Sequence, residues 1–124
     1  MTPDDAVTGP VSDVSDVSEV VVALTTVPVG EVGERIAQTL VEERLAACVA
    51  IHGPMTSIYR WSGRVQRDTE CQLVIKTTAA RVPALRQRIA ALHPYEVPEL
   101  LVWTVSGEGP YVEWVRAETA IFGG

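Results

Sequence analysis

Two long runs of strand-forming residues constrain the fold of this chain more than any other feature. The first run, AACVAIHGPMTSIYRW, covers residues 46–61, and the second, RVQRDTECQLVIKTT, covers residues 64–78. Ser62-Gly63 between them suits a tight turn, so the two runs predict a β-hairpin. Strands usually have about 5–6 residues, and this hairpin is therefore longer than the rest of a small domain can cover. Gly53-Pro54 predicts a bulge or bend in its first strand.

The other elements follow from hydrophobic periodicity. Residues 19–27, EVVVALTTV, predict a buried strand, and residues 28–45 predict an amphipathic helix. The apolar face of that helix carries Val29, Val32, Ile36, Leu40 and Val41. Pro83 suits the first turn of a second helix, residues 99–105 predict a strand, and Pro110 opens a short third helix. The resulting β-α-β-β-α-β order predicts an α+β, ferredoxin-like antiparallel sheet with two covering helices, an extended hairpin and a short C-terminal helix.

The length of the hairpin also predicts self-association. Its far end carries Ile58, Tyr59 and Trp61, and a single small sheet would leave these side chains and the strand edges exposed. Pairing with further copies of the chain would cover both. In the second strand of the hairpin, apolar and polar residues alternate, which predicts two distinct faces: Cys71, Leu73 and Ile75 against Glu70, Gln72 and Lys76.

Composition divides the 124 residues into a tail and one domain. Residues 1–18 are acidic, rich in Ser, Pro and Asp, and aperiodic, which predicts a flexible tail before a single domain of residues 19–124. The net charge is −6, but five of the 16 acidic residues lie within the first 20 residues, which hold no Lys or Arg. The remainder is nearly neutral and has no basic stripe, so a nucleic-acid partner is not expected.

The same composition bears on location. No apolar run approaches the roughly 20 residues that a membrane span needs, and no secretory signal precedes the domain. We therefore expect a cytoplasmic protein without a membrane partner. The two cysteines are not expected to form a structural disulfide there.

Residues 93–100, HPYEVPEL, admit two interpretations. Pro94 and Pro98 fix the backbone and favour extended conformations before them, so the stretch suits a rigid connection from helix to strand. The prolines do not account for His93, Tyr95, Glu96 and Glu99, whose side chains can bind a ligand or exchange protons. Sequence alone leaves both interpretations open.

Four stretches together resemble the CutA family of divalent-cation-tolerance proteins. They are LVEERLAACV, TSIYRWSGRV, CQLVIKTT and HPYEVPEL, in that order, and the resemblance runs from about Val20 to Ala117. It implies a compact homotrimer, in which the long hairpins pack against their neighbours, and a role in tolerance of copper and other divalent metals. In copper-binding members the ligands are a cysteine on the first strand and two histidines before the Pro-Tyr pair. This chain has Thr25, Leu92 and His93 at those positions.

The candidate site residues fall into two groups. His93 and Cys48 are the candidate ligands for copper or another divalent ion, because imidazole and thiolate are good donors for such metals. The second group predicts a cleft between subunits that suits a small polar ligand: Tyr59, Trp61, Lys76, Tyr95, Glu96 and Glu99. Lys76, the only lysine, would meet Glu99 or Glu96 of a neighbouring copy.

No catalytic motif is present. The sequence has no phosphate-binding loop, dinucleotide fingerprint, nucleophile elbow or His-Glu-x-x-His. The favoured function is therefore homotrimeric tolerance of, or response to, copper by metal binding without catalysis. The alternative is a trimeric sensor of a small molecule or anion that uses the cleft between subunits. The third hypothesis is an enzyme of a class that has no recognisable motif in this sequence.

The tail gives a direct test of the domain boundary. Deleting residues 1–18 should leave the oligomeric state and the melting temperature essentially unchanged, because this segment has no apolar face to bury. Light scattering and thermal unfolding of the full chain and the truncated chain measure both properties. A large fall in melting temperature would show that the segment is docked on the domain.

Overall fold

The computed structural model of the protein describes residues 18–121. The helices and strands follow in the order β1 (Val20–Pro28), α2 (Glu31–Glu42), β2 (Cys48–Trp61), β3 (Arg64–Thr78), the 3-10 turn η2 (Ala79–Arg81), α3 (Val82–Leu92), β4 (Leu101–Thr104) and α4 (Gly109–Glu118). Residues 1–17 of the predicted tail lie outside the described part of the chain.

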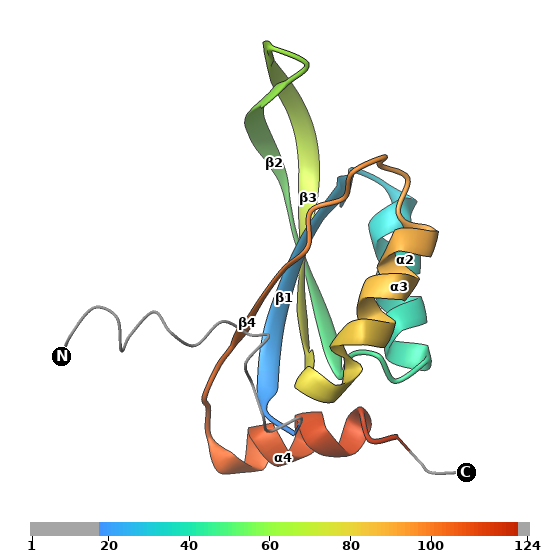
Figure 1. Cartoon of the computed structure of the whole chain (residues 1–124), viewed down its shortest axis with the longest axis vertical. Coiled ribbons are helices and arrows are strands. Elements are labelled where there is room, and N and C mark those ends of the chain that lie inside the picture. The colour runs from blue at the N-terminus through green and yellow to red at the C-terminus, as the bar shows by residue number, and fades with distance from the viewer. Residues whose placement is uncertain (1–17, 122–124) are drawn as a thin grey trace, which may run out of the picture.

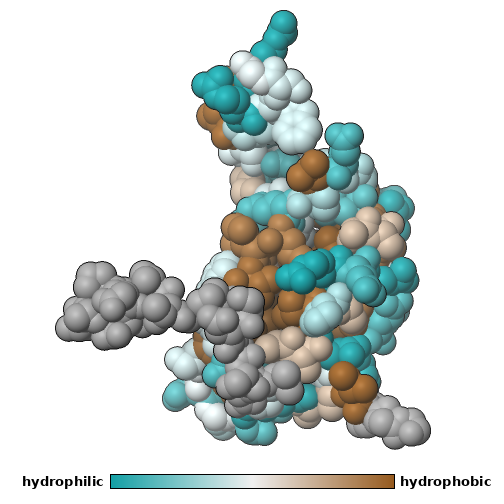
Figure 2. Space-filling view, viewed as in Figure 1, coloured by the Kyte–Doolittle hydropathy of each residue, from teal (hydrophilic) through white to brown (hydrophobic). Residues whose placement is uncertain are grey.

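The four strands form one antiparallel sheet in the order β2-β3-β1-β4. Helices α2 and α3 lie side by side against one face of the sheet, and α4 crosses the end opposite the hairpin tip (Figure 1). The predicted ferredoxin-like α+β fold is confirmed. In the space-filling view, apolar residues gather across the middle of the molecule, where the sheet lies (Figure 2).

The core lies between the sheet and the two helices. Leu73 and Ile75 of β3 are fully buried beneath Ile36 and Leu40 of α2, and Leu85 and Ile89 of α3 complete the cluster. The alternation predicted for residues 70–76 is therefore present, because Gln72, Val74 and Lys76 are only half-buried on the opposite face. Among residues 18–121, no helix is both long and apolar enough to cross a membrane.

Helix α2 is shorter than the sequence predicts. Gly30 has φ 121° and Arg44 has φ 59°, so left-handed backbone precedes and follows the helix. Val29 therefore lies outside the helix and is exposed, and Val41 is 42% exposed near its end. Their predicted place on the buried face was wrong. The buried positions of α2 are instead Gly33, Ile36, Ala37 and Leu40.

The hairpin of β2 and β3 projects well beyond the helices (Figure 1). Its register shifts between His52 and Met55, so Gly53-Pro54 forms the predicted irregularity. Beyond the shift, Ile58, Trp61 and Val65 are 61%, 48% and 65% exposed. Strands β2 and β4 are the two edges of the sheet within one chain.

The C-terminal helix closes the other end of the sheet. Val115 packs against Val20 and Ala47, and Arg116 Nε donates a hydrogen bond of 2.9 Å to the carbonyl oxygen of Ser18. Ser18, the last residue of the predicted tail, is thus held against the domain. A truncation after residue 17 would keep this bond, whereas a truncation after residue 18 removes it.

Gly53 gives a test of the hairpin geometry. Its φ is +128°, and an added Cβ would lie 3.1 Å from both the Cα of Cys71 and the carbonyl oxygen of Glu70. Gly53→Ala should lower the free energy of unfolding by about 1–3 kcal/mol, because alanine disfavours this conformation and the neighbouring backbone cannot move away easily. Urea unfolding followed by circular dichroism measures the change.

Gly109→Ala is the matched control. Gly109 is the first residue of α4, and an added Cβ would meet no atom within 4 Å. This variant should be neutral or slightly more stable, because alanine favours helix more than glycine does. Equal stability of the two variants would contradict a strained bulge at Gly53.

Candidate functional site

A wide hollow lies where the hairpin leaves the sheet. It has a volume of about 730 Å³ and is formed by β1, β2, β3 and the connection between α3 and β4. Its lining residues, which define the hairpin hollow, are Thr26, Ser57, Tyr59, Trp61, Asp68, Glu70, Pro94, Tyr95, Glu96, Val97 and Glu99. Distant parts of the sequence therefore meet there.

Two phenol–carboxylate pairs tie the walls of the hairpin hollow together. Tyr95 Oη donates a hydrogen bond of 2.6 Å to Glu70 Oε2, and Glu70 is only 8% exposed. Tyr59 on β2 donates to Asp68 on β3 across the hairpin. The Tyr95 bond joins the HPYEVPEL connection to β3, and the Tyr59 bond joins the two hairpin strands.

Both phenols are held in the protonated form. Burial raises the pKa of Tyr95 well above its ordinary value, and the bond to Glu70 raises it further. The bond to Asp68 raises the pKa of Tyr59 in the same direction. At neutral pH these hydroxyls therefore act as hydrogen-bond donors and not as bases.

The lining of the hairpin hollow is acidic. Asp68, Glu70, Glu96 and Glu99 contribute four carboxylates, and the lining includes no Lys, Arg or His. Three aromatic side chains, Tyr59, Trp61 and Tyr95, share the same walls. A concave surface with carboxylates of one sign attracts cations, and aromatic faces add to that attraction when the cation is organic.

His93 fixes the start of the connection. Its Nε2 lies 2.7 Å from the carbonyl oxygen of Thr26, and the backbone N–H of Tyr95 donates to its Nδ1 over 3.1 Å. Because a carbonyl only accepts and an N–H only donates, the ring must carry its proton on Nε2. The ring is 8% exposed and both nitrogens are engaged by backbone. His93 thus holds the connection against β1.

The structure brings together five of the six residues predicted for the cleft: Tyr59, Trp61, Tyr95, Glu96 and Glu99. Lys76 is not among them. Lys76 pairs with Val22, whereas Thr26 at the hollow pairs with Gln72, so Lys76 lies four residues, about 13 Å, further along β3. Within residues 18–121 Lys76 forms no ion pair, and any contact with Glu99 would have to join two copies of the chain.

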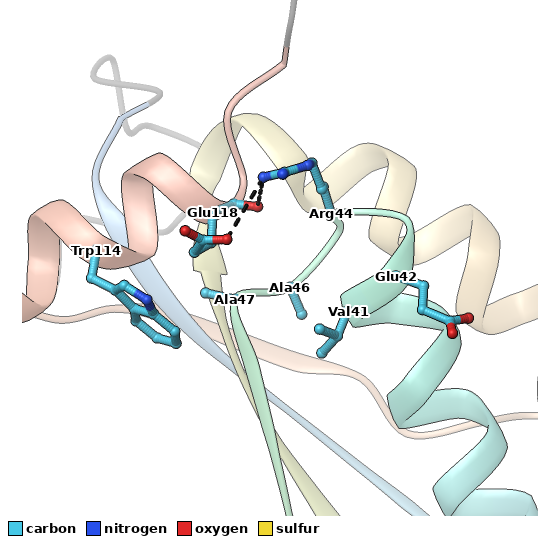
Figure 3. Close-up of a pocket in the computed structure, with 7 residues that line it drawn as sticks. All are labelled: Val41, Glu42, Arg44, Ala46, Ala47, Trp114 and Glu118. Atoms are coloured by element: carbon cyan, nitrogen blue, oxygen red, sulfur yellow. Dashed lines mark hydrogen bonds and ion pairs between the residues drawn. The ribbon is translucent and has the colours of Figure 1, made fainter.

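A second hollow of about 380 Å³ lies beside α4. In Figure 3 the Trp114 ring and the Val41 side chain border this space from opposite sides, and Arg44 reaches over it to α4. Arg44 Nη1 donates to the carbonyl oxygen of Glu118 over 3.1 Å and lies 3.8 Å from its carboxylate. These contacts hold the end of α4 against the turn after α2. The residues around this hollow therefore have a structural role in positioning α4.

Comparisons with known proteins show the family of the chain. The family model described as CutA1 divalent ion tolerance protein matches residues 21–118. The divalent-cation tolerance protein CutA of Thermus thermophilus is 50% identical over 99 residues, which are 79% of this chain and 96% of that protein. The chain belongs to the CutA1 family. Protein CutA of Homo sapiens is 44% identical over 98 residues, which are 78% of this chain and 55% of the human protein.

Solved structures of family members have the same fold. The structure of the divalent cation tolerance protein from Thermus thermophilus has a TM-score of 0.78 and 48% identity, and the match covers 82% of this chain and 99% of that chain. A structure described as PII-like protein CutA from Nostoc sp. PCC 7120, in apo form, has a TM-score of 0.76 and 42% identity, with 82% and 99% covered.

The residues expected to bind metal do not converge within one copy of this chain. Cys48 pairs with Lys76 on β3, about 13 Å along the strand from the row of Thr26 that His93 contacts. At the family ligand positions, Thr25 is fully buried without a hydrogen bond to its hydroxyl, and Leu92 packs against the core. Among residues 18–121, no three His, Cys, Asp or Glu side chains are grouped to hold a metal ion.

Two functional residues were missed from the sequence, namely Asp68 and Glu70. Both lie on the hairpin strand that faces the hollow, and each accepts a phenolic hydrogen bond. The strand alternation already placed Glu70 on the polar face. Its bond to Tyr95, however, joins residues 25 positions apart in the sequence, and no local sequence pattern predicts such a contact.

Tyr95→Phe tests the bond to Glu70. The variant should lose about 1–3 kcal/mol of unfolding free energy at neutral pH, because a buried carboxylate loses a donor. The native phenol has a raised pKa, so the unfolded chain ionises first as the pH passes 10.0, and this contribution to stability then falls. The difference between wild type and variant should therefore shrink above pH 10. Urea unfolding of wild type and variant at neutral pH and above pH 10 measures this difference in the free energy of unfolding.

Tyr111→Phe is the control, because Tyr111 is 45% exposed and its ring contacts that of Trp114 at a tilt. This variant should match wild type at neutral pH. A Tyr95→Phe variant as stable as the control would show that the bond to Glu70 contributes nothing to folding.

Proposed function

We propose that the protein is a homotrimer that acts in tolerance of divalent cations, copper in particular, by binding and not by catalysis. Membership of the CutA1 family supports the role in tolerance, because the family model and the Thermus thermophilus relative, of which 96% is covered, are both described by tolerance of divalent ions. The single structural observation that carries the proposal is the hairpin hollow with its four carboxylates and no cationic lining residue. The free cysteines suit a reducing compartment, and we propose the cytoplasm.

The unpaired edges of the sheet support the homotrimer. The 14 residues of β2 present one edge, and β4 presents the other. Leu101 and Trp103 of β4 are 53% and 42% exposed on the face away from α2 and α3. A long edge with exposed apolar neighbours is covered when another copy adds its own strand or packs against that face. Three copies in a ring would cover every such edge.

Metal binding would need more than one copy. Cys48, His93 and the carboxylates of the hairpin hollow do not form a group of three within the described residues of one chain. The carboxylates nevertheless concentrate cations at the hollow. Ligands from neighbouring subunits would then complete the coordination of copper, with Cys48 as the softest donor and carboxylate oxygen as the most abundant one.

The alternative is a sensor of a small molecule in the same hollow. Its volume suits a small ligand, and Tyr59, Trp61 and Tyr95 provide aromatic walls. The four carboxylates favour a cationic ligand over the anion considered from the sequence. The Nostoc relative is described as PII-like, which suits the interpretation of the fold as that of a trimeric sensor.

Copper binding and assembly can be measured together. Sedimentation should give three times the chain mass of 13.4 kDa, and calorimetric titration should detect copper binding. Glu96→Gln/Glu99→Gln should weaken copper binding about tenfold or more, because the hollow loses two carboxylates near the ion. A monomer at micromolar concentration contradicts the homotrimer. Absence of any copper binding, with heat released by an organic amine, would favour the sensor.

Glu31→Gln/Glu34→Gln is the matched control, because both residues are exposed in the first turn of α2. It makes the same change in net charge and should leave copper affinity unchanged. If Cys48→Ser abolishes binding while Glu96→Gln/Glu99→Gln does not, the metal lies at Cys48 and the hollow has another role.

A further inference from the structure

The second hollow, beside α4, has the composition of a small-ligand site. It lies where the connection from α2 to β2 meets α4, at the end of the sheet opposite the hairpin tip (Figure 1, Figure 3). Its volume of about 380 Å³ falls within the range of roughly 300–1,000 Å³ that small-molecule sites occupy. We call this space, between Val41 and Trp114, the α4 hollow.

Apolar side chains border the α4 hollow. Ala46 and Ala47 are buried, and Val41 and Trp114, each 42% exposed, lie on opposite sides of the space (Figure 3). The ring centroids of Tyr111 and Trp114 are 5.5 Å apart, and this contact helps to orient the indole. Val41 and Trp114 therefore present apolar surface that a ligand with an apolar part would remove from water.

Two opposite charges lie side by side at the edge of the α4 hollow. Arg44 Nη1 is 3.8 Å from Glu118 Oε1, which is longer than a hydrogen bond, and the two side chains are 45% and 48% exposed. The backbone that carries Arg44 is held in place, because Arg81 Nε donates a hydrogen bond of 3.2 Å to its carbonyl oxygen. A small ligand can therefore reach both charges from solvent.

We propose that the α4 hollow binds a free α-amino acid with a large apolar side chain. The carboxylate of the amino acid pairs with the Arg44 guanidinium, its ammonium pairs with the Glu118 carboxylate, and its side chain packs between Val41 and Trp114. A single carbon joins the two charged groups of an α-amino acid, so they lie about as close together as the charges of Arg44 and Glu118. This site goes beyond the proposed function, because the α4 hollow shares no lining residue with the hairpin hollow.

The same charges rank ligands that carry only one of the two groups. Glu42 and Glu118 give the border of the α4 hollow two carboxylates against the one guanidinium of Arg44. An amine should therefore bind better than a carboxylic acid of the same shape, and neither should match a molecule that carries both charges. The terminus of a peptide also carries only one charge, so the site should distinguish a free amino acid from the end of a chain.

Three molecules with the same phenyl ring test the proposal. Calorimetric titration of the full chain in metal-free buffer should detect binding of L-phenylalanine. Phenethylamine lacks the carboxylate and hydrocinnamate lacks the ammonium, so each should bind about tenfold more weakly or worse, with the amine ahead of the acid. Binding of L-phenylalanine no tighter than that of either analogue overturns the proposal, and so does the absence of binding at millimolar L-phenylalanine.

Glu118→Gln tests whether the amino acid binds at the α4 hollow. The advantage of L-phenylalanine over hydrocinnamate should disappear in this variant, because the ammonium loses its charged partner. Glu113→Gln is the matched control, since Glu113 lies on the same helix, pairs with Arg116 instead, and changes the net charge equally. Thermal unfolding verifies that both variants are folded. If Glu118→Gln binds L-phenylalanine as tightly as Glu113→Gln does, the proposed site is wrong, whatever the outcome for copper.

Discussion

The surplus length of the β2–β3 hairpin is the constraint on which the rest of the structure depends. The sheet has a core beneath α2 and α3 and a smaller one at α4, and the hairpin strands continue well past both. Backbone edges and apolar side chains beyond the core must be buried by another molecule or remain exposed to solvent. The hollow, the aromatic side chains and the exposed arginines all lie at or beyond the point where this cover ends.

The connection between α3 and β4 shows how one stretch serves both structure and site. His93 binds the backbone of β1, and Tyr95 binds Glu70 of β3, so two side chains two residues apart anchor the connection to two strands. That anchoring leaves Glu96 and Glu99 at the hollow without bonds of their own within the described chain. The two interpretations that the sequence left open are therefore compatible, with His93 and the prolines serving the connection and the carboxylates serving the site.

Periodicity predicted the order of elements and the class of fold, because alternation and helical spacing report directly which faces are buried. Element ends were less predictable, since the left-handed backbone at Gly30 and Arg44 depends on how α2 meets the sheet. Five of the residues predicted for the cleft line one hollow of a single chain. Lys76 lies four residues further along β3, a distance that depends on the strand register between β1 and β3, so its contact with Glu99 or Glu96 of a neighbouring copy stays a prediction.

The bulge at Gly53-Pro54 has a wider consequence. Two residues of β2 stand there opposite Cys71 alone, between the pairs His52–Gln72 and Met55–Glu70. Side chains alternate with a period of two, so in a regular strand two residues three positions apart lie on opposite faces. The bulge instead places His52 and Met55 on the same face, and Tyr59 and Trp61 therefore lie on the side of Asp68 and Glu70. Removing one of the two bulged residues would leave a single residue opposite Cys71 and would restore regular alternation, with every outer residue of β2 still on its present side of the ribbon.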